Sequence, residues 1–142
     1  MPSTLYDASF YVAALRRGDE GVIALRRLDS GSLVWLSAVV LQELYAGAGE
    51  NGRDVVERLE RDFDRVKRIL VPNLGDWTQA GRVLSRVATK YDYEQIGRSR
   101  LTNDALIAMS ARRLGISVIT ANERDFRRLA EFYPFHFQVV MV

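Results

Sequence analysis

Short apolar runs alternate with longer amphipathic segments along this chain, and this alternation constrains the fold more than any other feature. Leu33–Leu36 (LVWL) has no polar residue at every second position, which is typical of a strand buried on both faces. Such strands lie in parallel sheets that helices cover on both sides. The pattern predicts an α/β fold with three layers, α/β/α, around a central, mainly parallel sheet of four or five strands.

The expected elements follow in chain order. Strands are expected at residues 4–6, 33–36, 116–120 and 135–141, with a further extended segment at 69–72. Helices are expected at residues 10–17, 20–29, 38–48, 53–70, 76–91, 101–111 and 123–132, and a loop at 91–99. Gly18 and Gly115 follow two of these helices and are suited to end them. No repeat or linker interrupts the pattern, so residues 1–142 are expected to form a single domain.

The composition narrows the classes of chemistry and location. The chain has no cysteine, which excludes disulfides, thiolate metal sites and cysteine nucleophiles and suits a reducing compartment. No signal-peptide pattern opens the sequence, and no apolar run approaches the roughly 20 residues of a membrane span. A soluble, cytoplasmic protein without a membrane partner is expected. All but two of the 20 basic residues are arginines, which suits phosphate binding but equally a compositional habit of the genome.

An acidic residue, Asp104, interrupts the most apolar helical segment. Residues 101–111 (LTNDALIAMSA) have apolar residues at helical spacing, and Ala108 is a same-face neighbour of Asp104. With Thr102 or Asn103 as the helix cap, Asp104 would lie in the first turn and gain from the helix dipole. The residue pattern leaves this structural explanation and a functional one open.

Two further acids lie where the surrounding sequence suggests a functional role. Glu43 is in the middle of AVVLQELYAGA, where neither capping nor the helix dipole accounts for it; the structural alternative is a rim glutamate that reaches water. Asp7 directly follows the first expected strand, at the sheet edge where active sites of parallel α/β proteins form. Asp7 or Ser9 is also suited to cap the next helix.

The last acidic position lies in TANERDF, residues 120–126, after the expected strand at 116–120. Asn122 and Asp125 are three residues apart and resemble a reciprocal helix cap. For this pair a capping role and a catalytic role both remain open.

Carboxylates gathered at one sheet edge would repel one another, by about 4 kcal/mol per pair at 4 Å with an effective dielectric near 20. A hard divalent cation resolves that conflict, because Mg²⁺ and Mn²⁺ prefer oxygen ligands. Such a cation turns water into a nucleophile near neutral pH and offsets charge on a phosphorus centre. The implied reaction is phosphodiester hydrolysis.

With these residues in hand, the chain resembles the PIN-domain nucleases and, within them, the VapC-type toxins of toxin–antitoxin pairs. The matching segments, in the family's order and with its usual spacing, are LYDAS at 5–9, LSAVVLQELYAG at 36–47, NDALIAMSA at 103–111 and TANERDF at 120–126. Each motif alone is weak, but the four together are specific. The likeness spans nearly the whole chain and implies a PIN-like fold.

The resemblance also implies roles for individual residues. Asp7, Glu43 and Asp104 would form the catalytic acidic cluster that binds Mg²⁺ or Mn²⁺. Asp7 and Asp104 would be the direct ligands, with Glu43 holding a second metal or the attacking water. Ser9 and Thr120 would be the hydroxyl residues that support the cluster.

The fourth acidic position is where this sequence departs from the family. Members often have Asp at the place of Asn122, so the role falls either to Asn122, as a neutral ligand or water-positioning residue, or to Asp125 as a catalytic acid. A neutral fourth position would weaken a second metal site. One-metal and two-metal catalysis both stay open.

The function implied by the resemblance is a metal-dependent endoribonuclease, the toxin of a toxin–antitoxin pair, with RNA as substrate. A homodimer with a shared groove is implied, and a cognate antitoxin that inserts a helix or tail into it. Arg53–Leu70 is the candidate surface for the antitoxin, with plain internal packing as the alternative. Arg98 and Arg100 could hold the RNA backbone or an antitoxin carboxylate; otherwise they are solvated loop charges.

Other chemistries have less support. His136 is the one histidine of the chain and lies in the last expected strand, so neither a general base nor a zinc site is expected there. No GxxxxGK[ST] phosphate loop and no GxSxG elbow is present. Two alternatives to the ribonuclease stay open: a catalytically silent PIN-fold module that binds RNA or protein, and a DNA nuclease on the same site.

Overall fold

The computed structural model describes residues 2–18, 31–92 and 98–141. Five strands form one sheet in the order β3-β2-β1-β4-β5, and each neighbouring pair is parallel. Their bounds are β1 Ser3–Tyr6, β2 Leu33–Ser37, β3 Ile69–Leu70, β4 Ser117–Thr120 and β5 Phe137–Val139. The parallel sheet predicted from the apolar runs is confirmed, with five strands.

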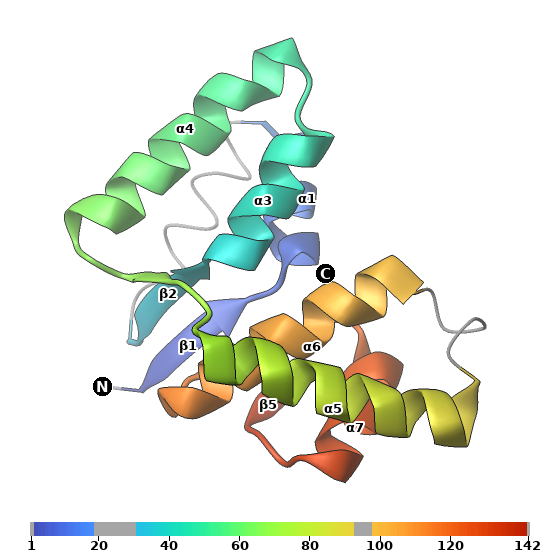
Figure 1. The fold of residues 1–142 in the computed structure, drawn as a ribbon. Helices are drawn as coiled ribbons and strands as arrows, with labels where there is room; N and C mark the ends of the chain where they lie inside the picture. The colour runs from blue at the N-terminus through green and yellow to red at the C-terminus, as the bar shows by residue number, and fades with distance from the viewer. Residues whose placement is uncertain (1, 19–30, 93–97, 142) are drawn as a thin grey trace.

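The described residues also form six helices. They are α1 Ala8–Arg16, α3 Ala38–Gly47, α4 Glu50–Arg65, α5 Leu74–Tyr91, α6 Arg98–Arg113 and α7 Glu123–Phe132. Figure 1 shows α1, α3 and α4 grouped on one side of the strands and α5, α6 and α7 on the other. The contacts agree, because α3 packs against α1 and α4, while α5, α6 and α7 pack on one another. The three-layer α/β/α fold is thereby confirmed.

The direction in which the chain adds strands reverses once. β1, β2 and β3 follow one another toward one edge of the sheet, and β4 and β5 are then added on the other side of β1. Crossovers between parallel strands are right-handed, so this reversal also moves the connecting helices to the opposite face. Parallel α/β proteins bind ligands at such a reversal, outside the carboxyl ends of the strands.

Local signals begin and end several helices where the sequence predicts. Asp7 and Ser37 are the N-caps of α1 and α3, and each accepts a hydrogen bond of 3.1 Å from a backbone N–H of the first turn. Gly18 and Gly115, both with φ of +68°, follow α1 and α6. A left-handed residue after a helix favours glycine, which has no Cβ to clash.

The core is built around α6. The apolar residues at helical spacing in its sequence include five with no exposed surface: Leu101, Ala105, Ile107, Ala108 and Ala111. Leu5, Leu36 and Val118, from three adjacent strands, belong to the same core. Among the described helices, none has the length and apolar character needed to cross a membrane.

Two helix boundaries differ from the expectation. α4 ends at Arg65, short of the expected residue 70, because the chain turns there to pair β3 with β2. α6 begins at Arg98, inside the expected loop, so Thr102 and Asn103 are interior residues and do not cap it. The helix expected at residues 20–29 lies outside the described residues.

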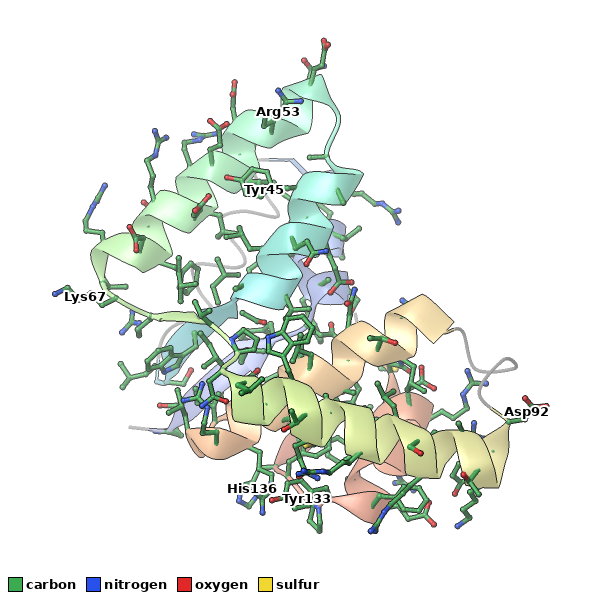
Figure 2. All side chains as sticks on the ribbon, in the orientation of Figure 1. Tyr45, Arg53, Lys67, Asp92, Tyr133 and His136 are labelled. Carbon is green, nitrogen blue, oxygen red and sulfur yellow. The ribbon has the colours of Figure 1, made fainter. Side chains whose placement is uncertain are left out.

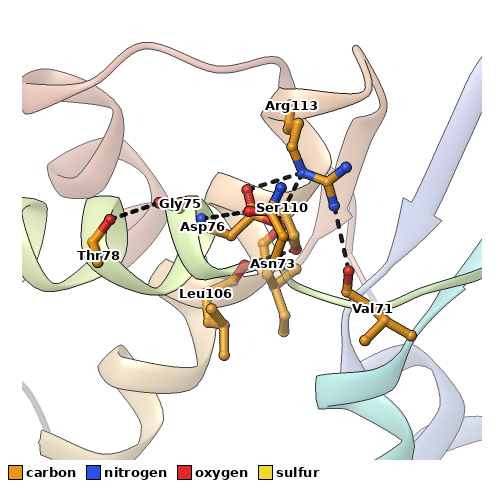
Figure 3. Close-up of polar contacts among 9 residues, drawn as sticks. Val71, Asn73, Gly75, Asp76, Thr78, Leu106, Ser110 and Arg113 are labelled. Atoms are coloured by element: carbon orange, nitrogen blue, oxygen red, sulfur yellow. Dashed lines mark hydrogen bonds and ion pairs between the residues drawn. The ribbon is translucent and has the colours of Figure 1, made fainter.

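An ion pair between a buried aspartate and an exposed arginine joins the start of α5 to the end of α6 (Figure 3). Arg113 Nε donates to both carboxylate oxygens of Asp76, at 3.1 and 3.0 Å, and Asp76 is 4% exposed. Asn73 and Asp76 also form a reciprocal capping box at the start of α5. Asp76 therefore serves as a partner for two elements at once.

Replacing Asp76 with alanine should lower the free energy of unfolding by about 2 kcal/mol, because the change removes half of a capping box and the partner of Arg113. Urea unfolding at pH 7 measures this loss. The matched control is Glu123→Gln, which breaks the exposed pair of Glu123 with Arg127 and should change stability by less than about 0.5 kcal/mol. Equal losses in the two variants would show that Asp76 does not tie α5 to α6.

Candidate active site

A pocket of about 270 Å³ lies at the carboxyl ends of β1 and β4, where the strand order reverses. Its lining comes from separate segments of the chain: Asp7, Ala8, Ser9, Glu43, Arg100, Asp104, Ala121 and Asn122. Asp7 directly follows β1, and Ala121 directly follows β4. Glu43 and Asp104 come from α3 and α6, which pack against each other. The structure therefore places the three acids singled out by the sequence in one pocket.

Asp7 is held by hydroxyl groups on both of its oxygens. Its Oδ1 accepts hydrogen bonds from the backbone N–H (3.1 Å) and the hydroxyl (2.5 Å) of Ser9. Its Oδ2 accepts a hydrogen bond of 2.5 Å from the Thr120 hydroxyl. The Asp7 carboxylate is buried, so these two residues fix its orientation in the pocket.

Glu43 reaches the pocket from the middle of α3. Burial raises the pKa of its carboxyl, and so does the charge of Asp7, while Arg100 and a hydrogen bond from the Asn103 side chain lower it. Its Oε1 atom is buried and has no hydrogen-bond partner among the described residues. Buried polar atoms are normally paired, so this oxygen lacks the donor or cation that such a position calls for.

Asp104 lies almost two turns after the start of α6, so the dipole effect of a first helical turn does not account for it. Burial raises the pKa of Asp104 to about 8, and the charges of Asp7 and Glu43 contribute to the increase. Asp125 raises this pKa as well, and Arg100 lowers it. At neutral pH the isolated pocket therefore favours the protonated acid, and a nearby cation would favour the ionised form.

Asn122 connects the pocket to Asp125. Its side-chain nitrogen donates to Asp104 Oδ2 at 3.2 Å and to Asp125 Oδ2 at 2.9 Å. Its backbone N–H donates to the Thr120 hydroxyl oxygen at 2.9 Å. Asp125 is buried and is not among the residues that line the pocket. The fourth predicted acid is thus linked to Asp104 through an amide.

Arg100 contributes a positive charge to the pocket. Its side chain is exposed and lines the cavity, and it lowers the pKa of both Glu43 and Asp104. Arg98 is the first residue of α6, and its side chain is not among those that the structure describes. Arg98 and Arg100 both lie in the first turn of this helix, so the alternative that they are loop charges is wrong.

His136 lies away from the pocket. It is exposed and directly precedes β5, and its backbone carbonyl accepts a hydrogen bond of 3.0 Å from the N–H of Val118. Figure 2 places His136 at the opposite end of the molecule from Tyr45, which marks α3. The histidine therefore extends the sheet hydrogen bonding and is not a base for the acidic cluster.

The donor set of the pocket fits a hard divalent cation. Asp7, Glu43 and Asp104 offer carboxylate oxygens, which are the ligands that Mg²⁺ and Mn²⁺ prefer. Within residues 2–18, 31–92 and 98–141, no three acidic or histidine side chains converge on one point as a preformed cage. Mg²⁺ is typically held by one or two carboxylates, waters and substrate phosphate, so a pair of these acids is sufficient.

Sequence reasoning missed three residues of this site. Asn103 is one of the two cap candidates, but it lies inside α6 and its side chain hydrogen-bonds Glu43. Ala8 and Ala121 line the pocket beside the polar residues. The signal available for all three was their position next to a predicted site residue in the sequence.

Fold and site together define a class of protein: a three-layer α/β domain with an acidic pocket where its parallel sheet changes direction. The PIN domain family model matches residues 4–132. The chain belongs to the PIN domain family.

Solved structures share this fold over nearly the full chain. DNA-bound VapBC from Salmonella typhimurium matches with a TM-score of 0.70 and 19% identity, over 98% of this chain and 98% of that chain. VapBC2 from Rickettsia felis bound to a promoter DNA fragment matches with a TM-score of 0.60 and 18% identity, over 98% of this chain and 99% of that chain. VapBC-1 from nontypeable Haemophilus influenzae matches with a TM-score of 0.59 and 20% identity, over 96% of this chain and 97% of that chain. A comparison with curated protein sequences gave no significant match.

The stability of the metal-free protein should depend on pH through Asp104. Its folded-state pKa of about 8 exceeds the ordinary value of 3.8, so the folded state holds a proton that the unfolded state has lost at the pH values in between. Stability should therefore fall as pH rises across that window. Urea unfolding in EDTA at pH 5 and pH 8 should show a larger loss for the wild type than for Asp104→Asn. The same pH dependence in both proteins would contradict the raised pKa.

Proposed function

We propose that this PIN domain is a metal-dependent endoribonuclease that acts as the toxin of a toxin–antitoxin pair. The observation that carries the proposal is the meeting of Asp7, Glu43 and Asp104 in one pocket. Two further features support it: the Glu43 oxygen, which has no hydrogen-bond partner among the described residues, and the raised pKa of Asp104. A raised pKa is expected where carboxylates gather for a cation, because like charges in a buried site destabilise the ionised form. An oxygen without a hydrogen-bond donor is available as a ligand of that cation.

In this proposal Asp7 and Asp104 bind Mg²⁺ or Mn²⁺ directly, and Ser9 and Thr120 hold the Asp7 carboxylate in a fixed orientation. When bound, the cation offsets the negative charge that develops on the phosphorus centre and the leaving oxygen. Glu43 accepts a proton from the attacking water. Its raised pKa suits that role, because a general base is most effective when its pKa approaches the working pH.

RNA is the proposed substrate. The sequence pI is about 9.1, and the arginine fork pairs well with phosphate oxygens. Arg100 lines the pocket beside the acids, and we assign it to the RNA backbone next to the cleaved bond. Arg98, two residues before it in α6, is proposed to contribute to the same contact.

The proposed protein partners are a cognate antitoxin and a second copy of this chain. The similar structures are of VapBC proteins, two of them bound to DNA. Within the chain, α4 packs on α3 and β3, Val56 is its buried residue, and Val66 just after it is 49% exposed. We propose this helix as the antitoxin surface, with the acidic pockets of two copies facing a shared groove.

Purified protein should cleave labelled RNA, EDTA should block the cleavage, and added Mn²⁺ should restore it. Asp104→Asn should reduce the rate at least about 100-fold, since the loss of a group acting in metal binding or proton transfer has an effect of that size or larger. Glu123→Gln, which removes an exposed acid of α7, is the matched control and should cleave at the wild-type rate. Circular dichroism checks that both variants keep the fold.

Retained Mn²⁺-dependent cleavage by Asp104→Asn would count against the assigned site. Hydrolysis of DNA in place of RNA would make the protein a DNA nuclease on the same acids. Binding of RNA without hydrolysis under any metal condition would support the catalytically silent module.

Expression of this chain alone should arrest growth, and co-expression of a small neighbouring gene that encodes a DNA-binding protein should relieve the arrest. Colony counts after induction measure both effects. Asp104→Asn is the control for toxicity that does not depend on the pocket, and it should permit growth without the neighbour. Arrest by that variant would show that the toxicity does not come from cleavage.

A further inference from the structure

Asn122 is the N-cap of α7, but capping is the weakest of its side-chain hydrogen bonds. Its Oδ1 accepts from the Asp125 N–H at 3.5 Å, whereas its Nδ2 donates to Asp125 at 2.9 Å and to Asp104 at 3.2 Å. Its backbone N–H donates to Thr120 instead of the Asp125 side chain. Of the reciprocal cap that the spacing resembles, the described hydrogen bonds contain only the first half, in contrast to the complete capping box at the start of α5.

The direction of the amide follows from the charges around it. An ionised carboxylate, as Asp104 would be with a cation bound, only accepts hydrogen bonds, so the amide oxygen would be repelled where Nδ2 now faces Asp104 and Asp125. Serine, threonine or aspartate would cap a helix about as well as asparagine. Among these cap residues, only the amide both accepts from the helix start and donates twice to carboxylates.

Asp125 has the surroundings of an anchor for that amide. It is 2% exposed, it does not line the pocket, and its Oδ2 accepts the shorter of the two bonds from Nδ2. Its other oxygen, Oδ1, accepts a bond of 3.4 Å from Nε of Arg124, an exposed side chain. Both oxygens of Asp125 thus accept hydrogen bonds, one from Asn122 and one from Arg124, and Asp125 itself does not line the cavity.

We propose that Asn122 is a positioning residue that fixes Asp104 for cation binding and makes this pocket a one-cation site, with Asp125 as the anchor of the amide. The inference rests on the proposed function, because it concerns the same pocket. A neutral donor between two carboxylates relieves their repulsion without supplying the further negative ligand that a second cation would need. It also ties Asp104 to Thr120 and, through the Thr120 hydroxyl, to Asp7.

Isothermal titration calorimetry of the full chain with Mn²⁺ tests the proposal without relying on cleavage. The wild type should bind one Mn²⁺ per chain. Asn122→Ser keeps a helix cap but loses the amide bridge, and it should bind Mn²⁺ about 10- to 100-fold more weakly, as is typical when the partner of a metal ligand is removed. Its melting temperature should stay close to that of the wild type. Glu123→Gln, in the same helical turn, should leave the Mn²⁺ affinity unchanged.

Two further variants separate the roles of the pair. Asp125→Asn keeps an oxygen that can accept from the Asn122 amide, so it should bind Mn²⁺ far more tightly than Asp104→Asn does. Asn122→Asp keeps the cap and adds a fourth carboxylate, so its stoichiometry should rise from one Mn²⁺ to two. This variant also carries the test if Asn122→Ser fails to fold.

Wild-type affinity in Asn122→Ser, or two Mn²⁺ per wild-type chain, would overturn the inference and leave the proposed function intact. Loss of Mn²⁺ binding in Asp125→Asn to the level of Asp104→Asn would make Asp125 a ligand and overturn its role as an anchor. A wild type that binds no Mn²⁺ would overturn both the inference and the cation basis of the proposed function.

Discussion

The hydrogen bond from the Thr120 hydroxyl to the Asp7 carboxylate is the contact on which the site depends. It joins the ends of β1 and β4, which are neighbours in the sheet although the two residues are 113 positions apart. The strand order reverses between these two strands, so their loops diverge and leave a crevice. α3 and α6 close that crevice and bring Glu43 and Asp104 to Asp7.

The polar groups around the pocket divide the task of holding the acids. Two hydroxyls fix Asp7, the amide of Asn122 holds Asp104, and the guanidinium of Arg100 acts on Asp104 and Glu43. None of these donors neutralises the cluster, since Asp104 still has a pKa of about 8 and Oε1 of Glu43 is unpaired within the described chain. The remaining electrostatic strain is concentrated where an oxygen-ligated cation would relieve it.

Much of the fold was predictable from local patterns. Apolar runs located the strands, and the cap candidate Asp7 and the glycines after α1 and α6 gave helix bounds within a few residues. The two errors have different origins. α4 stops early to let β3 pair with β2, so pairing with a distant segment overrides the local preference. The first turn of α6 carries arginines, which look like a polar loop in the sequence.

By itself, the sequence determined the layers, the parallel sheet and the set of acids that their local surroundings do not explain. It could do so because periodicity, capping and the burial of apolar runs act over a few adjacent residues. Only the tertiary structure decided what each polar side chain faces. Asp104 lies beyond the first turn of α6, where the helix dipole has little effect, and the Asn122 amide donates to two carboxylates. Asp104 has its amide partner at the start of α7, and one of the two carboxylates that the Asn122 amide contacts lies on α6. No local pattern can reveal a contact between two elements that are distant in the sequence.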